Sequence, residues 1–392
     1  MFLSLKNNNS ELNRNFFNGE KNFYLCIAAI LFFFVITQEF PNIEQIYNSG
    51  FSDSISYLEI AKCATLTNCQ EIQFAEGVTS FHIQRWFPNV LAGFISTNFA
   101  ISIEKSYVFL QFISLFIVVI STINSNFKNS TKLILLIFVL FFPYTFRYYF
   151  FAYTSLADSL FFSACYLVCI GVVNKKTWML LAGLILGALA RQTIIMLMPI
   201  LVFAFAYKFI SFRILLTSIL LIISGYLLNL YLSSFLFNIP SFSFLKIATG
   251  VFQEASTEEW SFFLSRIILF VILLLPIFIF QFSTRSKYIF LVTVALISLQ
   301  PILGGAVYVG GGNVSRLMAF SISFIPFLFI DRVKIFDSQI VLISFILALN
   351  SLHHIYSINN SKSAYLFLLF FSCSLLILYF VLNYGIKRLS SL

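Results

Sequence analysis

Charged residues are scarce in this chain of 392 residues: they make up 10% of the sequence, whereas hydrophobic residues make up 60%. A soluble globular protein carries about 25% charged residues, so this composition cannot cover a water-facing surface. The mean hydropathy of +0.94 therefore predicts an integral membrane protein in contact with a lipid bilayer. The net charge of +9 comes from basic pairs scattered between apolar runs, which indicates membrane topology, and we expect no nucleic-acid partner.

Three further features are missing from the sequence. There is no cleavable signal peptide, because the first apolar run begins only at residue 22 and lacks a small-residue cleavage site, so it should remain as an anchor. There are no internal repeats and there is no separate soluble domain, which predicts one transmembrane domain over residues 1–392. There is also no Cys/His cluster with the spacing of a metal site.

Twelve apolar runs approach or reach the roughly 17–25 residues that cross a bilayer. Lys and Arg orient them, since these residues gather in cytoplasmic loops. Three Lys or Arg residues precede the first run, and two lie in each of six predicted inner segments. Fifteen of the 24 Lys and Arg residues therefore face inward. We expect an all-α protein of a bacterial inner (plasma) membrane with both termini cytoplasmic, a tail over 1–21, and spans over 22–40, 106–123, 133–151, 159–173, 178–192, 194–210, 214–236, 263–283, 288–306, 316–330, 339–356 and 364–384.

Residues 41–104 interrupt this pattern and are predicted to form the first extracytoplasmic loop, which carries the candidate active site. Two interfacial or re-entrant helices are expected within it, over 53–64 and 86–101. Treating the second as a full span would place Lys128 and Lys132 outside, against the positive-inside rule.

The six cysteines divide into two groups. Four lie within apolar runs and are expected to act as small hydrophobic side chains. Cys63 and Cys69 share the first outer loop and would form a disulfide if that loop faces an oxidising compartment. Spacing alone leaves this pairing open, because it does not give the geometry.

Asp53 lies in GFSDSISYLEIAKC, just beyond the first span. One interpretation is structural: Asp53 or Ser52 caps the helix, and Ser56 with Glu59 has capping-box spacing. The other is chemical: a carboxylate at the lipid–water boundary accepts a proton from an incoming hydroxyl. For that role, desolvation at the bilayer edge is expected to raise the pKa of Asp53.

Asp158 and Arg191 stand at the ends of apolar runs, where a charged side chain is costly unless it has a partner or a function. Asp158 either caps a helix or supports the chemistry. Arg147 is either its partner or a side chain that extends outward to the membrane surface. Arg191 is either the polar residue of a tight turn or a ligand for a lipid phosphate, because its guanidinium donates two hydrogen bonds to phosphate oxygens. We favour the phosphate ligand.

Four more outer-face residues complete the candidate site. Arg85 precedes the re-entrant helix and Arg316 follows a glycine-rich loop, so both are expected to help bind the phosphate. Tyr57, one helical turn after Asp53, and His82 are assigned to substrate binding. The GGGN of the glycine-rich loop lacks the Lys–Ser/Thr ending of a P-loop and predicts a flexible turn.

Five segments occur in a recognisable order: SDSISYLEIAK, FHIQRWFPNVLAG, FFPYTFRYYFFAYTSLADSLFF, AGLILGALARQTIIMLMPIL and GGGNVSRLMAF. This order resembles the GT-C superfamily of polytopic glycosyltransferases, and within it the bacterial dolichyl-phosphate-mannose-protein mannosyltransferase-like group. The resemblance covers residues 20–210 well and the remainder loosely.

The resemblance implies a GT-C-like fold and a hexosyl- or pentosyltransferase that moves a sugar from a polyprenyl-phosphate carrier to a glycan, lipid or protein acceptor on the extracytoplasmic face. By this match Asp53 is the catalytic base, Asp158 supports it, and Arg191 contacts the carrier phosphate. Many relatives have two acidic residues together after the first span, whereas Ser54 follows Asp53 here. We therefore expect no cofactor and do not favour a divalent metal, although the sequence leaves that open.

Two other functions fit a polytopic membrane protein. A surface-polysaccharide polymerase or ligase also has outer-face arginines, but its large loop comes late in the chain, whereas the main loop here is early. A secondary transporter places charges near mid-membrane between matching halves, whereas these charges gather on one face. Glycosyl transfer is the expected function.

Overall fold

The structure is a computed structural model that describes residues 53–63, 80–238, 255–303, 312–331, 333, 335, 337–351 and 374. Within these ranges the chain forms α-helices and short 3₁₀ helices (η) and contains no strand, which confirms the all-α prediction. The elements are α3 (Asp53–Ala61), α4 (Ser80–Ile83), α5 (Trp86–Phe99), α6 (Ile103–Ile123), α7 (Asn129–Phe141), α8 (Phe146–Phe151), α9 (Leu156–Val173), α10 (Thr177–Ala190), η2 (Gln192–Met196), α11 (Leu197–Ala206), α12 (Phe212–Phe237), α14 (Thr257–Leu274), η3 (Leu275–Ile279), α15 (Thr284–Ser298), α16 (Gln300–Leu303), α17 (Gly312–Met318), η4 (Ala319–Phe329) and α18 (Asp337–Ser351).

Four segments are long and apolar enough to cross a membrane: α6, α9, α12 and the continuous stretch Thr257–Ile277. Large apolar side chains on their outer faces are exposed, among them Phe116, Leu220 and Phe235. Such a surface is stable in lipid and costly in water, so the protein is a membrane protein. The prediction of twelve spans stays a prediction, since the first predicted span, and the last one except for residue 374, lie outside the described residues.

Several predicted spans are divided in the structure. The span predicted over 133–151 is broken between α7 and α8 at Pro143, and Tyr144 there has φ 65°. Proline lacks the N–H that a continuing helix needs. Pro276 lies in η3 and Pro326 in η4, so the predicted spans over 263–283 and 316–330 also change from α to 3₁₀ geometry. Hydropathy does not detect these breaks, because the residues around them are apolar too.

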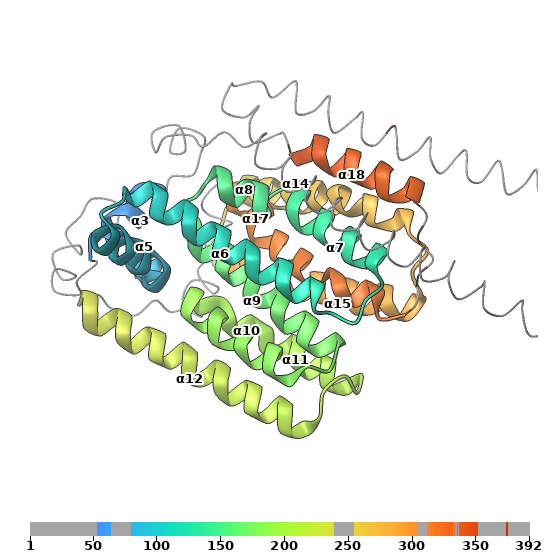
Figure 1. Ribbon diagram of the computed structural model, residues 1–392, viewed down its shortest axis with the longest axis horizontal. Helices are drawn as coiled ribbons and strands as arrows, with labels where there is room; N and C mark the ends of the chain where they lie inside the picture. The colour runs from blue at the N-terminus through green and yellow to red at the C-terminus, as the bar shows by residue number, and fades with distance from the viewer. Residues whose placement is uncertain are drawn as a thin grey trace, which may run out of the picture.

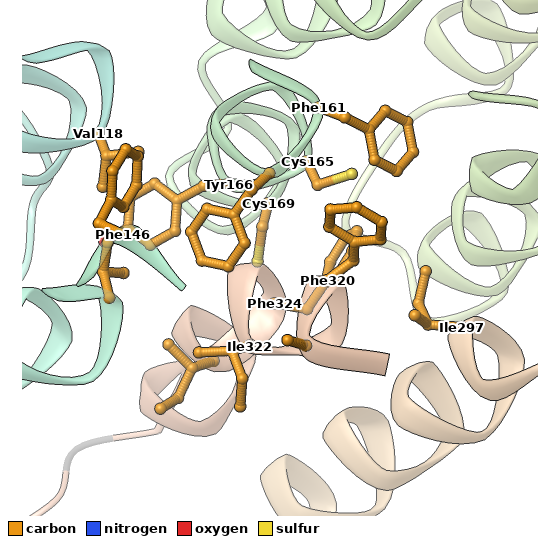
Figure 2. Close-up of a cluster of buried hydrophobic side chains, with 14 of the residues drawn as sticks. Val118, Phe146, Phe161, Cys165, Tyr166, Cys169, Ile297, Phe320, Ile322 and Phe324 are labelled. Carbon is orange, nitrogen blue, oxygen red and sulfur yellow. The ribbon is translucent and has the colours of Figure 1, made fainter. Parts of the chain in front are cut away.

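Helix α9 lies at the centre of the molecule, between α6, α10 and η4 (Figure 1). Its polar side chains hydrogen-bond to α6: Ser163 to Ser114 at 2.8 Å between hydroxyl oxygens, and Tyr166 to Thr122 at 2.7 Å. Such bonds stabilise helix contacts in a membrane, where lipid tails are as apolar as the side chains and the hydrophobic effect does not drive helices together. On its other side α9 meets η4 through aromatic rings, and Figure 2 shows Phe161 beside Phe320.

Helices α3 and α5 confirm the two short helices expected in the first outer loop, and they lie together at one end of the molecule (Figure 1). Their backbones approach very closely at Gly93, where a Cβ would lie 1.8 Å from the carbonyl oxygen of Ala61. Only glycine fits such a contact. Because α3 begins with Asp53, this contact also fixes the position of that carboxylate.

We predict that Gly93→Ala separates α3 from α5 and lowers the free energy of unfolding by about 1–3 kcal/mol, the usual range for overpacking. Thermal unfolding in detergent micelles measures this. Gly187→Ala is the matched control, since its Cβ would meet only the end of the Ile194 side chain, at 2.4 Å. An equal loss in both variants would contradict the argument.

Cys63 forms a disulfide whose partner lies outside the described residues, whereas Cys165 and Cys169 are free and buried. We predict that the partner is Cys69. Peptide mapping of the unreduced protein should recover a cross-linked peptide joining the two, and Cys69→Ser should leave Cys63 open to thiol reagents. A peptide joining Cys63 to any other cysteine would show that the prediction is wrong.

Candidate functional site

Asp53 lies among three cationic or potentially cationic side chains. Its Oδ1 is 3.4 Å from Nε2 of His82, and its Oδ2 is 3.5 Å from Nη2 of Arg316 and 4.0 Å from Nη1 of Arg85. Glu59, expected as a capping-box residue, instead pairs with Lys62 at 2.6 Å. The Asp53 carboxylate is thus part of a charged cluster as well as the first residue of α3.

Asp158 is the second carboxylate of this cluster and is buried in the first turn of α9. Its Oδ1 accepts a hydrogen bond from Nη1 of Arg191, and its Oδ2 lies 3.2 Å from Nε of Arg316. The sequence suggested Arg147 as the partner, but the structure pairs Asp158 with Arg191 and Arg316. Arg316 therefore bridges the two aspartates.

Arg191 occupies the reversal between α10 and η2, as the predicted tight turn requires. Its backbone is extended, with φ −153° and ψ 142°, which ends α10. The guanidinium lies 5.2 Å from the ring centroid of Phe320 and 6.0 Å from that of Phe161, the two rings that meet in Figure 2. Cation–π attraction to these rings offsets part of the cost of burying the charge.

Arg85 is held by the ends of α3 and α5. Its Nη1 donates to the hydroxyl of Tyr57, whose ring meets His82 edge to face at 5.7 Å between centroids. Asn89 donates from Nδ2 to the Arg85 carbonyl at 2.9 Å. The structure thus places all seven predicted site residues in one connected cluster, drawn from α3, α4, the turn before α5, α9, α17 and the reversal after α10.

Sequence reasoning missed Tyr107 and Asn89, which support this cluster from behind. The Tyr107 hydroxyl on α6 lies 3.0 Å from the Tyr57 carbonyl and 2.9 Å from Oδ1 of Asn89. Tyr107 sits within an apolar span and Asn89 within a short amphipathic helix, so neither has a sequence signal that separates it from ordinary packing.

The pKa of Asp53 lies well below its ordinary value, the opposite of the expectation from sequence. Burial alone raises it, but the hydrogen bond with His82 and the charges of Arg316, His82 and Arg85 outweigh burial. For Tyr57, burial raises the pKa to about 12, although the charge of Arg85 acts in the other direction. Near neutral pH the cluster therefore combines an ionised Asp53 with a neutral Tyr57 hydroxyl.

Exposure separates the two carboxylates. The Asp53 side chain is 15% exposed, whereas that of Asp158 is 2% exposed. An entering molecule therefore reaches Asp53 more readily, and Asp158 is enclosed with Arg191 and Arg316. Asp53 is therefore the more accessible of the two carboxylates.

An apolar groove of about 220 Å³ lies between α5, α10 and α12, and none of the seven cluster residues lines it. Its walls include Trp86, which follows Arg85, and Leu189, close to Arg191 in the chain. Nε1 of Trp86 and Oδ1 of Asn229 are buried there without a hydrogen-bond partner among the described residues. Buried polar groups usually have partners, so these two atoms are exceptions within the described residues.

Across the described residues, no group of three His, Cys, Asp or Glu side chains is arranged to hold a metal ion. No protein-family model matches the sequence, and no curated protein or solved structure shows significant similarity to it. The chemistry of the site is therefore argued from its own geometry.

We predict that Arg316→Met lowers the free energy of unfolding by about 3–5 kcal/mol, because removing one member of a buried ion pair leaves charges uncompensated. Adding Asp158→Asn should recover part of this loss, since it removes one of the stranded charges. Thermal unfolding of the single and double variants in detergent gives the coupling between the two sites. Additive losses would show that the two side chains do not interact.

Proposed function

We propose that the protein is an integral membrane glycosyltransferase that moves a sugar from a polyprenyl-phosphate carrier to a glycan, lipid or protein acceptor. One observation carries the proposal: a buried cluster of three arginines holds one accessible carboxylate, Asp53. An apolar groove whose lining includes chain neighbours of Arg85 and Arg191 adds to it. The substrate this arrangement fits has a phosphate, a long apolar tail and a reacting hydroxyl partner.

The charge of the cluster favours an anionic ligand. Three guanidinium groups face two carboxylates, which leaves one positive charge in excess when His82 is neutral. An uncompensated charge in a low-dielectric site is costly. A phosphate compensates it and accepts bidentate hydrogen bonds from arginine.

Because the pKa of Asp53 is low, phosphate binding to the arginines would also change the basicity of this carboxylate. A base is most effective when its pKa is near the working pH, and Asp53 paired with Arg316 and Arg85 is a weak base. A phosphate that engages these two arginines compensates two of the charges that, together with His82, hold the pKa of Asp53 down. Burial then raises the pKa, so binding of the donor turns Asp53 into a stronger base.

The reaction is a single displacement. The acceptor hydroxyl attacks the anomeric carbon while its proton passes to Asp53, and the bond from that carbon to the phosphate oxygen breaks. Arg191, Arg85 and Arg316 stabilise the negative charge that grows on the leaving polyprenyl phosphate. Tyr57 and His82 orient the sugar or the acceptor, and the configuration at the anomeric carbon inverts.

The groove beside Trp86 supports the carrier part of the proposal. Its leucine, isoleucine and aromatic walls accept a polyprenyl segment, and it reaches the lipid-facing helix α12. With basic loops inside, the cluster faces the extracytoplasmic side of a bacterial inner membrane. A transporter would instead enclose its charges near the membrane centre.

We predict that Asp53→Asn lowers the rate of glycosyl transfer by about 10²–10⁴-fold, the usual contribution of a general base. Asn keeps helix-capping capacity but does not accept the proton. Cells that carry the variant should lose the glycosylated product and accumulate the carrier-linked sugar, both measured by mass spectrometry of extracts.

Glu59→Gln is the matched control, because Glu59 is another acid on α3 and, among the described residues, forms its ion pair with the neighbouring Lys62. It should leave product and carrier at wild-type levels when protein amounts are equal. Wild-type product in cells with Asp53→Asn would overturn the proposed mechanism.

A further inference from the structure

A second polar feature lies at the opposite ends of α9 and α10 from Asp158 and Arg191. It is a partly open cavity of about 600 Å³ between the α9–α10 turn and the α11–α12 turn. In Figure 1 the start of α12 lies at the far end of the molecule from α3 and α5. Since α9 has 18 residues, about 27 Å separates the two features along its axis.

Two lysines form the rim of this cavity, and both occupy an unusual backbone position. Lys175 has φ 56° and Lys208 has φ 60°, each just after the end of a helix. Both turns close with the same hydrogen bond, from Lys176 N–H to Gly171 O at 2.8 Å and from Phe209 N–H to Ala204 O at 2.9 Å. Glycine is the residue that favours this position, so local stability does not explain lysine at both turns.

Other features of the cavity also favour an anion. Thr177 begins α10 and Ser211 caps α12, so the positive ends of two helix dipoles lie at its lining. Arg285 adds a third cation, 5.5 Å from the centroid of the lining residue Phe209. No Asp or Glu occurs among the residues that line the cavity, all of which belong to the described part of the chain.

The remaining lining is apolar, with Leu180, Phe205, Ile210 and Ile214 among its residues. Trp178 and Phe212 lie next to it in sequence and are 63% and 62% exposed. Exposed aromatic residues beside lysines are typical of the boundary between lipid and water. The cavity thus joins an anion-binding rim to an apolar wall at the surface of a membrane.

We propose that this cavity binds the headgroup of an anionic phospholipid, with Lys175 and Lys208 on its phosphate and an acyl chain against the apolar wall. The proposal is independent of the reaction at Asp53. It rests on the lysines, the two helix N-termini and the wall that they share.

The test is a titration of the full chain in detergent, followed by native mass spectrometry, with dioctanoyl phosphatidylglycerol as the probe. Each Lys near an anionic headgroup contributes about fivefold in affinity, so Lys175→Gly with Lys208→Gly should weaken binding by about thirtyfold. Glycine suits both turns, so the double variant should fold with an unchanged or higher melting temperature. Lys105→Ala removes an exposed lysine in the first turn of α6, at the end of that helix opposite the cavity, and should bind the probe like the wild type.

Two further ligands separate the possible sources of the anion. Dioctanoyl phosphatidylcholine should bind at least tenfold more weakly than phosphatidylglycerol, and inorganic phosphate should not displace the lipid. Displacement by phosphate would overturn the lipid assignment. Equal binding of both lipids, or a double variant that binds like the wild type, would overturn the role of the lysines.

Discussion

The cluster around Arg316 depends on one constraint: a charge removed from water must meet an opposite charge in good geometry. Arg316 meets two, with Asp53 at 3.5 Å and Asp158 at 3.2 Å. These residues come from α17, α3 and α9, so their pairing ties the first described helix to the centre of the bundle and to a helix late in the chain. The close contact of α3 with α5 and the aromatic contact of α9 with η4 hold the backbone in the position that this pairing needs.

The sequence predicted the helices and the charged residues of this arrangement better than the contacts between them. Apolar length located α6, α9 and α12, and the charge pattern separated the short helices α3 and α5 from the spans. Each charged residue in an apolar context was recognisable, because such residues are rare in membrane segments. The partners of Asp158 were not recognisable. Arg147 is near in sequence, whereas the actual partners Arg191 and Arg316 lie 33 and 158 positions away. The break at Pro143 and the 3₁₀ segments that contain Pro276 and Pro326 also escaped hydropathy.

The pKa of Asp53 shows why a site cannot be judged from burial alone. Desolvation predicts a raised pKa, and the structure contains that effect, but neighbouring cations reverse it. The direction therefore depends on His82 as well as on Arg316 and Arg85. A ligand that engages those arginines would change the basicity of Asp53 without touching it. Under the proposed function, Asp53 would be a weak base in the empty site and a stronger one when an anion is bound.

The charged side chains at the two ends of α9 and α10 differ in their burial and in their partners. Around Asp158, arginines are buried and neutralised by carboxylates, whereas Lys175 and Lys208 lie exposed on an open cavity whose lining contains no acid among the described residues. The first end suits a ligand that competes with internal ion pairs, and the second suits one that binds without displacing any. The hairpin of α10 and α11 connects them, since its reversal carries Arg191 and its open end forms the cavity. A lipid held at the open end would therefore fix the same hairpin that presents Arg191 to the cluster.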